Sequence, residues 1–152
     1  MIAVGETAPE FEAPDSAGRT LRLSSLRGKK VLLYFFPKAL TAGCAAETRQ
    51  FGVLAPALAE QGILVLGISV DTAETQSRFA VSCKATFPLL SDVSKSIARS
   101  YGVLSVLGVA KRVSFLIDEE GIVRGTKSSV LPGPHLDWAE GLRDRGSPPR
   151  AG

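Results

Sequence analysis

Two stretches of the chain are apolar at almost every position: residues 30–36 (KVLLYFF) and residues 63–70 (ILVLGISV). Neither stretch alternates with polar residues, and both consist mainly of aromatic, leucine and β-branched side chains. Runs of this length and composition are typical of central strands that are buried on both faces of a sheet. The pattern therefore predicts two such strands.

Between these runs the hydrophobic period becomes that of a helix. Phe51, Leu54 and Leu58 recur at helical spacing. Glu47 falls on the opposite, polar side. We therefore expect a helix over about residues 43–60.

A second helix is predicted after the second apolar run. Asp71 is followed three residues later by Glu74, which is the spacing of an N-cap residue and its acidic partner. The helix would carry Phe79 and Cys83 on one face, with Cys83 near its end.

The rest of the chain alternates short strands and helices, which indicates an α/β fold with a central mixed sheet flanked by helices. With 152 residues the chain is long enough for one well-buried core and too short for two ordinary domains. We expect one domain over residues 1–145 and a disordered tail over residues 146–152. The remaining predicted elements are an N-terminal β-hairpin (11–14 and 20–23), a strand (86–90), a helix (93–101), a second hairpin (113–117 and 122–125) and a last helix (135–142).

The charged residues argue against a nucleic-acid partner. The net charge is +3, but the bases are scattered and form only pairs such as Lys29-Lys30 and Lys111-Arg112. No basic stripe interleaved with aromatic residues appears. The apolar runs are far too short to span a bilayer, and the first residues show no basic segment followed by an apolar core. We therefore expect a cytoplasmic protein with no membrane partner.

The chain has two cysteines and one histidine. These are too few for a disulfide scaffold or a structural zinc site, so the expected metal and cofactor content is none. His135 is expected to cap or flank the last helix. If the two cysteines have a role in function, that role rests on the reactivity of their thiols.

The position of Cys44 in the sequence is typical of a reactive thiol. It stands between a strand and a helix, in a first turn where free backbone N–H groups and the helix dipole favour a thiolate. Thr41 precedes it by three residues, the spacing at which an N-cap hydroxyl meets position N3. Pro37 presents no N–H and can restrict water, and the N–H groups of Gly43 and Cys44 could add an oxyanion-type pair. Taken alone, Cys44 is also compatible with a small buried hydrophobe.

The motif Pro37-x-x-x-Thr41-x-x-Cys44, followed by Glu47, resembles the active-site signature of the peroxiredoxins. The resemblance is to the bacterioferritin comigratory protein or PrxQ subfamily, and it extends over about residues 5–142. It implies a thioredoxin-like fold with an N-terminal hairpin extension, and thiol-dependent reduction of hydrogen peroxide and organic hydroperoxides. Three further segments carry the resemblance: 67–71 (GISVD), 87–92 (FPLLSD) and 112–118 (RVSFLID).

The resemblance also implies roles for individual residues. Cys44 would attack the peroxide, with Thr41 and Arg112 stabilising the transition state and Gly43 and Glu47 in support. In many relatives a resolving cysteine lies five positions after the first, where this chain has Arg49. Other members place it on the next helix, which Cys83 fits. A Cys44–Cys83 disulfide, reduced by thioredoxin or a similar protein, would then close the cycle.

Alternatives remain open at this point. If Cys83 only packs beside Phe79, a one-cysteine peroxidase with an external thiol follows. A redox sensor or a holdase chaperone would use the same oxidisable cysteine, Cys44. A protein that only binds a partner is a further alternative, but it gives no reason for the motif around Cys44. A thioredoxin-type oxidoreductase is disfavoured because Glu47 stands where the second cysteine of Cys-x-x-Cys would be. The subfamily resemblance implies a monomer or a weak homodimer.

Overall fold

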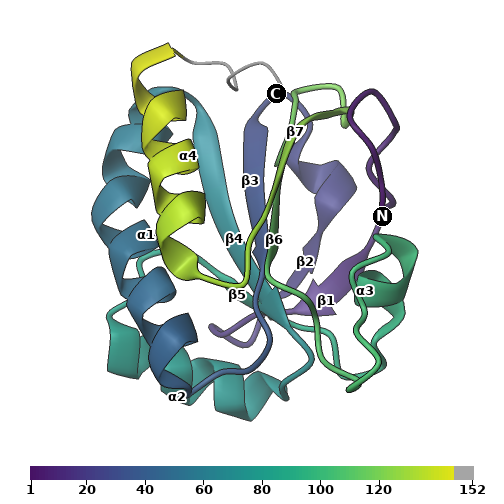
Figure 1. Ribbon diagram of the computed structural model, residues 1–152, viewed down its shortest axis with the longest axis vertical. Coiled ribbons are helices and arrows are strands. Elements are labelled where there is room, and N and C mark those ends of the chain that lie inside the picture. Colours follow the sequence, from purple (N-terminus) through teal and green to yellow (C-terminus); the bar gives the residue numbers. More distant parts are fainter. Residues whose placement is uncertain (146–152) are drawn as a thin grey trace.

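The computed structural model describes residues 1–145, and the tail predicted for residues 146–152 lies outside them. A five-stranded sheet forms the centre (Figure 1). Its strands are β3 (Lys30–Phe35), β4 (Ile63–Ser69), β5 (Leu89–Ser91), β6 (Val113–Ile117) and β7 (Val123–Ser128). They lie in the order β5-β4-β3-β6-β7, with β3, β4 and β5 parallel and β6 and β7 antiparallel to their neighbours. The predicted mixed sheet is confirmed.

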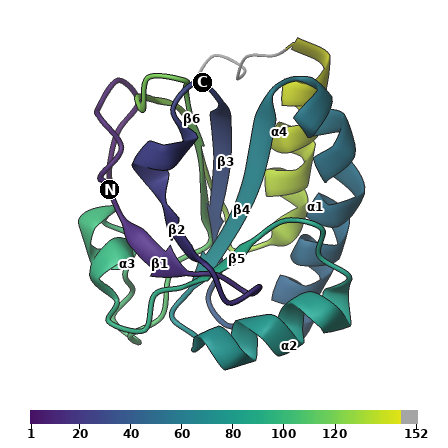
Figure 2. The ribbon, with the colours of Figure 1, turned by 180° about the vertical axis from the view of Figure 1, so that it is seen from behind.

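Helices and a hairpin cover the two faces of this sheet. Figures 1 and 2 show α1 (Ala42–Glu60) and α4 (Pro132–Arg145) on one side. The other side carries α3 (Ser96–Ser100) and the antiparallel N-terminal hairpin. The hairpin consists of β1 (Glu12–Pro14) and β2 (Thr20–Arg22), and a 3-10 turn, η1 (Leu23–Leu26), follows it. A further helix, α2 (Ala73–Cys83), buries Phe79 and Cys83 in the same apolar cluster as α1.

The central strand β3 joins two separate cores. Its side chains alternate between the faces of the sheet, as the pleat requires. Each fully buried large side chain contributes about 1.5–3 kcal/mol. Because both faces are covered, the loop that follows β3 starts from a firmly held point. One core contains Val31, Leu33 and Phe35, and the other contains Leu32, Tyr34 and the residue after the strand, Phe36.

The start of α2 differs from the prediction. Its N-cap is Thr72, whose hydroxyl accepts a hydrogen bond from the Thr75 N–H at 3.2 Å. Asp71 does not serve as the cap, because its carboxylate binds elsewhere, as described below.

Several other elements differ in extent from the predictions, and β7 continues to Ser128, beyond the predicted 122–125. β5 begins at Leu89, and α4 is longer than the predicted 135–142. α3 is shorter than the predicted 93–101, because the Asp92 carboxylate accepts hydrogen bonds from the N–H groups of Ile97 and Ala98 and so defines its first turn.

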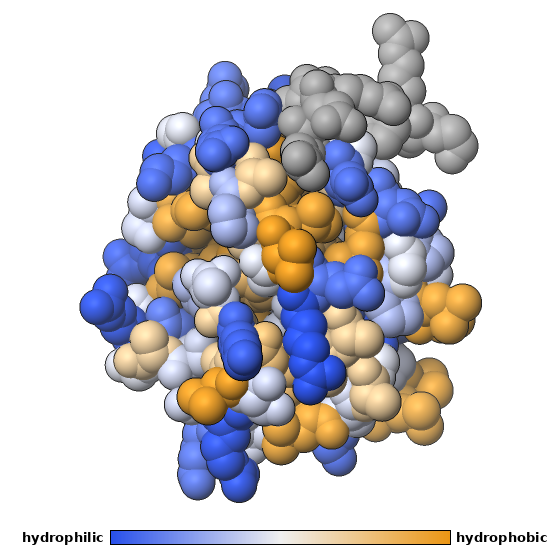
Figure 3. Space-filling view, turned by 90° about the vertical axis from the view of Figure 1, so that its left-hand side faces the viewer, coloured by the Kyte–Doolittle hydropathy of each residue, from blue (hydrophilic) through white to orange (hydrophobic). Residues whose placement is uncertain are grey.

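The molecular surface over α1 and α4 is mixed in character. Figure 3 shows this side, where hydrophilic side chains interrupt the hydrophobic areas. Within residues 1–145, no helix has both the length and the apolar composition needed to cross a bilayer.

A glycine is required at one position in the pairing of β3 with β4. Gly67 lies opposite Tyr34 in the parallel register. A Cβ atom at Gly67 would come within 2.8 Å of the Tyr34 ring and 2.7 Å of Leu89. Both neighbours are fully buried and have little room to move.

We therefore expect Gly67→Ala to lower the free energy of unfolding by about 1–3 kcal/mol, the usual cost of overpacking a core. Urea denaturation measures the change. Gly141→Ala is the matched control, because a Cβ there meets nothing within 4 Å and the residue lies within α4. The control should be neutral or slightly stabilising, since alanine is the better helix former. Equal stability of Gly67→Ala and the wild type would contradict this packing.

Candidate active site

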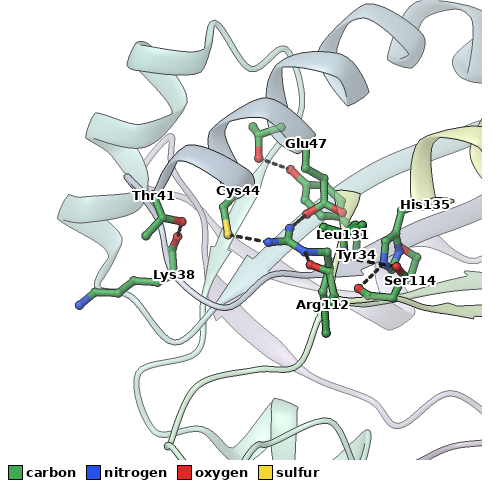
Figure 4. A network of polar contacts seen from close by, with 12 residues as sticks. Tyr34, Lys38, Thr41, Cys44, Glu47, Arg112, Ser114, Leu131 and His135 are labelled. Atoms are coloured by element: carbon green, nitrogen blue, oxygen red, sulfur yellow. Dashed lines mark hydrogen bonds and ion pairs between the residues drawn. The ribbon is translucent and has the colours of Figure 1, made fainter. Parts of the chain in front are cut away.

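Cys44 lies in the first turn of α1, directly after the loop that leaves β3 (Figure 4). It is the third helical residue after the N-cap Thr41, so backbone N–H groups without helical partners surround it. Its thiol is free, and the residue is only 1% exposed. A buried sulfur at a helix N-terminus can hold negative charge where little water reaches it.

The loop before Cys44 is fixed by a carboxylate that the sequence did not reveal as a site residue. Asp71 follows β4, and one of its oxygens accepts hydrogen bonds from the Ala39 N–H at 2.7 Å and from the Ser69 hydroxyl at 2.6 Å. In the same loop Leu40 has a φ of 64°, a left-handed conformation that is uncommon for leucine. The parallel pairing of β3 and β4 was the signal that could have placed Asp71 beside this loop.

Arg112 brings a cation to the sulfur. It immediately precedes β6, whose first residue, Val113, pairs with Phe35 at the end of β3. The guanidinium Nη2 donates to the Cys44 sulfur at 3.4 Å, and Nε donates to the Val130 carbonyl at 3.2 Å. The Arg112 side chain is 8% exposed. The structure thus brings Arg112 and Cys44 together from distant parts of the sequence.

Glu47 is buried, which corrects the prediction that it lies on the polar face of the helix. It follows Cys44 by about one helical turn, so both side chains point the same way (Figure 4). One carboxylate oxygen forms an ion pair with Arg112, and the other, Oε2, has no hydrogen-bond partner among the described residues. Burial raises the pKa of Glu47 to about 7, although Arg112 acts in the opposite direction.

Thr41 and Gly43 complete the rim of the site. The Thr41 hydroxyl donates to the Lys38 carbonyl at 2.7 Å and makes no capping hydrogen bond. The expected contact with position N3 is therefore wrong, because the Thr41 side chain is turned toward the Lys38 carbonyl. The Thr41 oxygen keeps lone pairs that can accept. Gly43 lies under the guanidinium, since a Cβ atom there would be 3.5 Å from Arg112 Nη2.

A hollow of about 490 Å³ opens beside Pro37 and Arg112. Its other lining is largely apolar and comes from the segment before β6 and the turn after β7. Several exposed apolar side chains lie in the same segments and in the loop before Cys44. They are Leu40, Val106, Leu107, Val130 and Leu131.

Cys83 is the last residue of α2 and is also a free, buried thiol. It shares an apolar cluster with Cys44. Arg49, which stands five positions after Cys44, lines a hollow of about 420 Å³ together with Cys83. Burial raises the pKa of Cys83, while the charge of Arg49 acts in the opposite direction.

His135 lies near the start of α4 and is fully buried. Its ring bonds Ser114 and the backbone of Ser129. In the part of the chain that the structure describes, no three His, Cys, Asp or Glu side chains gather where they could hold a metal ion.

The sequence and the fold are similar to those of known proteins. The model of the AhpC/TSA family matches residues 4–126. The chain belongs to this family. Peroxiredoxin Bcp of Escherichia coli K12 is 38% identical over 143 residues, which cover 90% of this chain and 92% of the relative.

Solved structures of AhpC/TSA-like proteins place the chain in the Bcp branch of the peroxiredoxins. The crystal structure of peroxidoxin BcpB from Mycobacterium tuberculosis has a TM-score of 0.88 at 35% identity, covering 95% of this chain and 97% of that one. A structure of the bacterioferritin comigratory protein of Xanthomonas campestris has a TM-score of 0.83 at 26% identity, covering 90% and 91%. The thioredoxin-like fold of a peroxidase is thereby confirmed.

The burial of Glu47 predicts how stability depends on pH. Because the pKa is raised, from 4.5 to about 7, the native state binds more protons than the unfolded state between these pH values. The stabilisation from the protonated carboxyl is therefore complete below pH 4.5 and is lost as the pH rises to about 7. The loss amounts to roughly 3–4 kcal/mol, since the pKa rises by about 2.5 and one pKa unit corresponds to about 1.4 kcal/mol.

Glu47→Gln isolates this effect, because its amide does not titrate. We expect the free energy of unfolding of the wild type, minus that of the variant, to fall across this range and to level off above it. Urea denaturation at a series of pH values measures the difference. A difference that stays level or rises would contradict a buried carboxyl with a raised pKa.

Proposed function

We propose that the protein reduces hydrogen peroxide and organic hydroperoxides with Cys44 as the attacking thiolate. The observation that carries the proposal is the 3.4 Å contact between the Arg112 guanidinium and the Cys44 sulfur at a helix N-terminus. The sulfur attacks one peroxide oxygen, and an S–O bond forms as the O–O bond breaks. The electron pair leaves with the second oxygen, which takes up a proton and departs as water or an alcohol. Cys44 is left as a sulfenic acid.

The surrounding groups match the charge that develops in this step. Negative charge spreads from the sulfur over both oxygens, and fixed donors that meet it accelerate the reaction. Arg112 supplies N–H donors and a positive charge. The N–H groups of Gly43 and Cys44 lie in the first turn of α1 and have no helical partners. Thr41 keeps an acceptor oxygen for the O–H of a peroxide.

The apolar surroundings support organic hydroperoxides as substrates. The hollow beside Pro37 and Arg112 is lined mainly by apolar side chains, including Val109 and Val130. Such a lining favours the organic part of a hydroperoxide, while its peroxide group faces the guanidinium. Alkyl peroxide reduction is the activity described for the similar bacterioferritin comigratory protein of Xanthomonas campestris.

Cys83 is proposed to resolve the sulfenic acid. Its thiol attacks the Cys44 sulfur, a disulfide forms and water leaves. A thioredoxin-type dithiol then reduces the disulfide and is itself oxidised. Cys83 ends α2 beside Lys84, which has a left-handed conformation, and helix ends open at little cost. Pro56 within α1 adds a second weak point.

The cytoplasmic location and the monomeric or weakly dimeric state stay predictions.

Stopped-flow mixing of the reduced protein with hydrogen peroxide tests the first step. We expect the wild type to react far faster than free cysteine, and Cys44→Ser not to react at all. Arg112→Lys keeps a positive charge but loses the planar fork of donors, and its rate constant should fall by roughly a hundredfold. A wild-type rate constant no greater than that of free cysteine would overturn the proposed function.

The resolving role of Cys83 has its own test. Cys83→Ser should complete one turnover with peroxide and then fail to cycle with thioredoxin and its reductase. Ser82→Ala, an exposed neighbour on α2, is the matched control and should cycle normally. Oxidation of the wild type should form an intramolecular disulfide and weaken the far-UV circular dichroism of the helices. Full cycling of Cys83→Ser would contradict the resolving role and leave Cys83 as a residue that only packs in the core.

A further inference from the structure

The one histidine of the chain is buried behind the site and takes no part in the chemistry proposed above. His135 and Ser114 are both fully buried, and their side chains lie 2.8 Å apart from Nδ1 to Oγ. The other ring nitrogen, Nε2, lies 3.0 Å from the Ser129 carbonyl oxygen. Figure 4 shows this group beside Arg112.

These contacts define the protonation of the ring. A carbonyl oxygen only accepts hydrogen bonds, so Nε2 must carry a proton. In the neutral ring, Nδ1 is then the acceptor and the Ser114 hydroxyl donates to it. Burial lowers the pKa of His135, and the nearby charges of Arg112 and Lys127 act in the same direction, while the bond to Ser129 opposes them. All polar atoms of the ring are thus satisfied in one defined tautomer.

The histidine fixes a turn that also holds the catalytic cation. Ser129, which accepts from His135, donates its own N–H to the Arg112 carbonyl at 3.3 Å. The next residue, Val130, accepts from Arg112 Nε at 3.2 Å. Its carbonyl therefore sets the direction in which the guanidinium leaves the backbone. The two remaining nitrogens of the guanidinium point to Glu47 and to Cys44.

We propose that His135 is a positioning residue for Arg112: by holding the Ser129 carbonyl, it fixes the turn whose Val130 carbonyl aims the guanidinium at Cys44. The effect of His135 on the reaction rests on the proposed function of Cys44. His135 touches neither the sulfur nor the space for a peroxide. A shift of the Val130 carbonyl would rotate the fork of donors away from the sulfur.

Two variants of similar size and polarity separate this role from simple packing. The amide of His135→Gln reaches the place of Nε2 and can donate to the Ser129 carbonyl. The amide of His135→Asn, one methylene shorter, stays near the place of Nδ1 and keeps only the Ser114 contact. Both replace the buried ring by an amide, so their general cost in stability is similar.

We expect His135→Gln to react with hydrogen peroxide at close to the wild-type rate in single-turnover stopped flow. His135→Asn should be slower by about tenfold to a hundredfold, the loss associated with misplacing a reacting group by up to about 1 Å. Alkylation of Cys44 by iodoacetamide at pH 7, followed on the Cys44 peptide by mass spectrometry, should separate the variants in the same order. Equal rates for the two variants, whether high or low, would overturn the positioning role.

A spectroscopic measurement on the wild type keeps the proposal testable if His135→Asn fails to fold. Nitrogen-15 NMR of the imidazole ring at pH 7 should show the neutral tautomer with the proton on Nε2. A proton on Nδ1 alone, or an imidazolium, would overturn the proposal. If the wild type does not reduce peroxide, the proposed function fails. The alkylation of Cys44 then still reports on the position of Arg112, and the tautomer still reports on the contact between His135 and Ser129.

Discussion

The guanidinium of Arg112 is the group on which the arrangement of the site depends. It is largely buried and donates to three acceptors on two segments that are far apart in the sequence. These are the Cys44 sulfur and the Glu47 carboxylate on α1, and the Val130 carbonyl after β7. A guanidinium is planar, and its donors have fixed directions. The three contacts can be made together only when α1 and the turn after β7 occupy defined places beside β6.

The topology of the sheet brings these segments to one edge. The parallel strands β3 and β4 end on the same side, so the loop that leads to Cys44 lies next to Asp71. β6 runs antiparallel to β3 and therefore starts on that side, where Arg112 precedes it. The end of β3 thus leads to the thiol, and the residue after β4, Asp71, holds the loop in place. The start of β6 supplies the cation. The helix dipole of α1 adds to the same local field.

The sequence is sufficient for the parts of this arrangement that depend on local pattern. The apolar runs predict the central strands, and the turn before Cys44 predicts the helix start. Contacts between distant segments leave no such periodic trace. The pattern places Glu47 on a polar face because amphipathicity cannot show that a charged residue has a buried partner in Arg112. It makes Asp71 a helix cap because the Ala39 N–H that donates to this carboxylate is close only in the folded chain.

The buried pair of Glu47 and Arg112 is better explained by chemistry than by stability. Removing two charges from water costs several kcal/mol for each ion, and their mutual attraction rarely returns more than this. One Glu47 oxygen also lacks a hydrogen-bond partner within residues 1–145. In the same buried environment, however, the positive charge of Arg112 acts on the Cys44 sulfur much more strongly than it would in water. A carboxyl with a pKa of about 7 beside that charge holds the guanidinium in place and compensates its charge only in part. The pair therefore supplies a cation that is fixed in direction and incompletely neutralised. The reaction proposed for Cys44 requires such a cation, because it gathers negative charge on sulfur and oxygen.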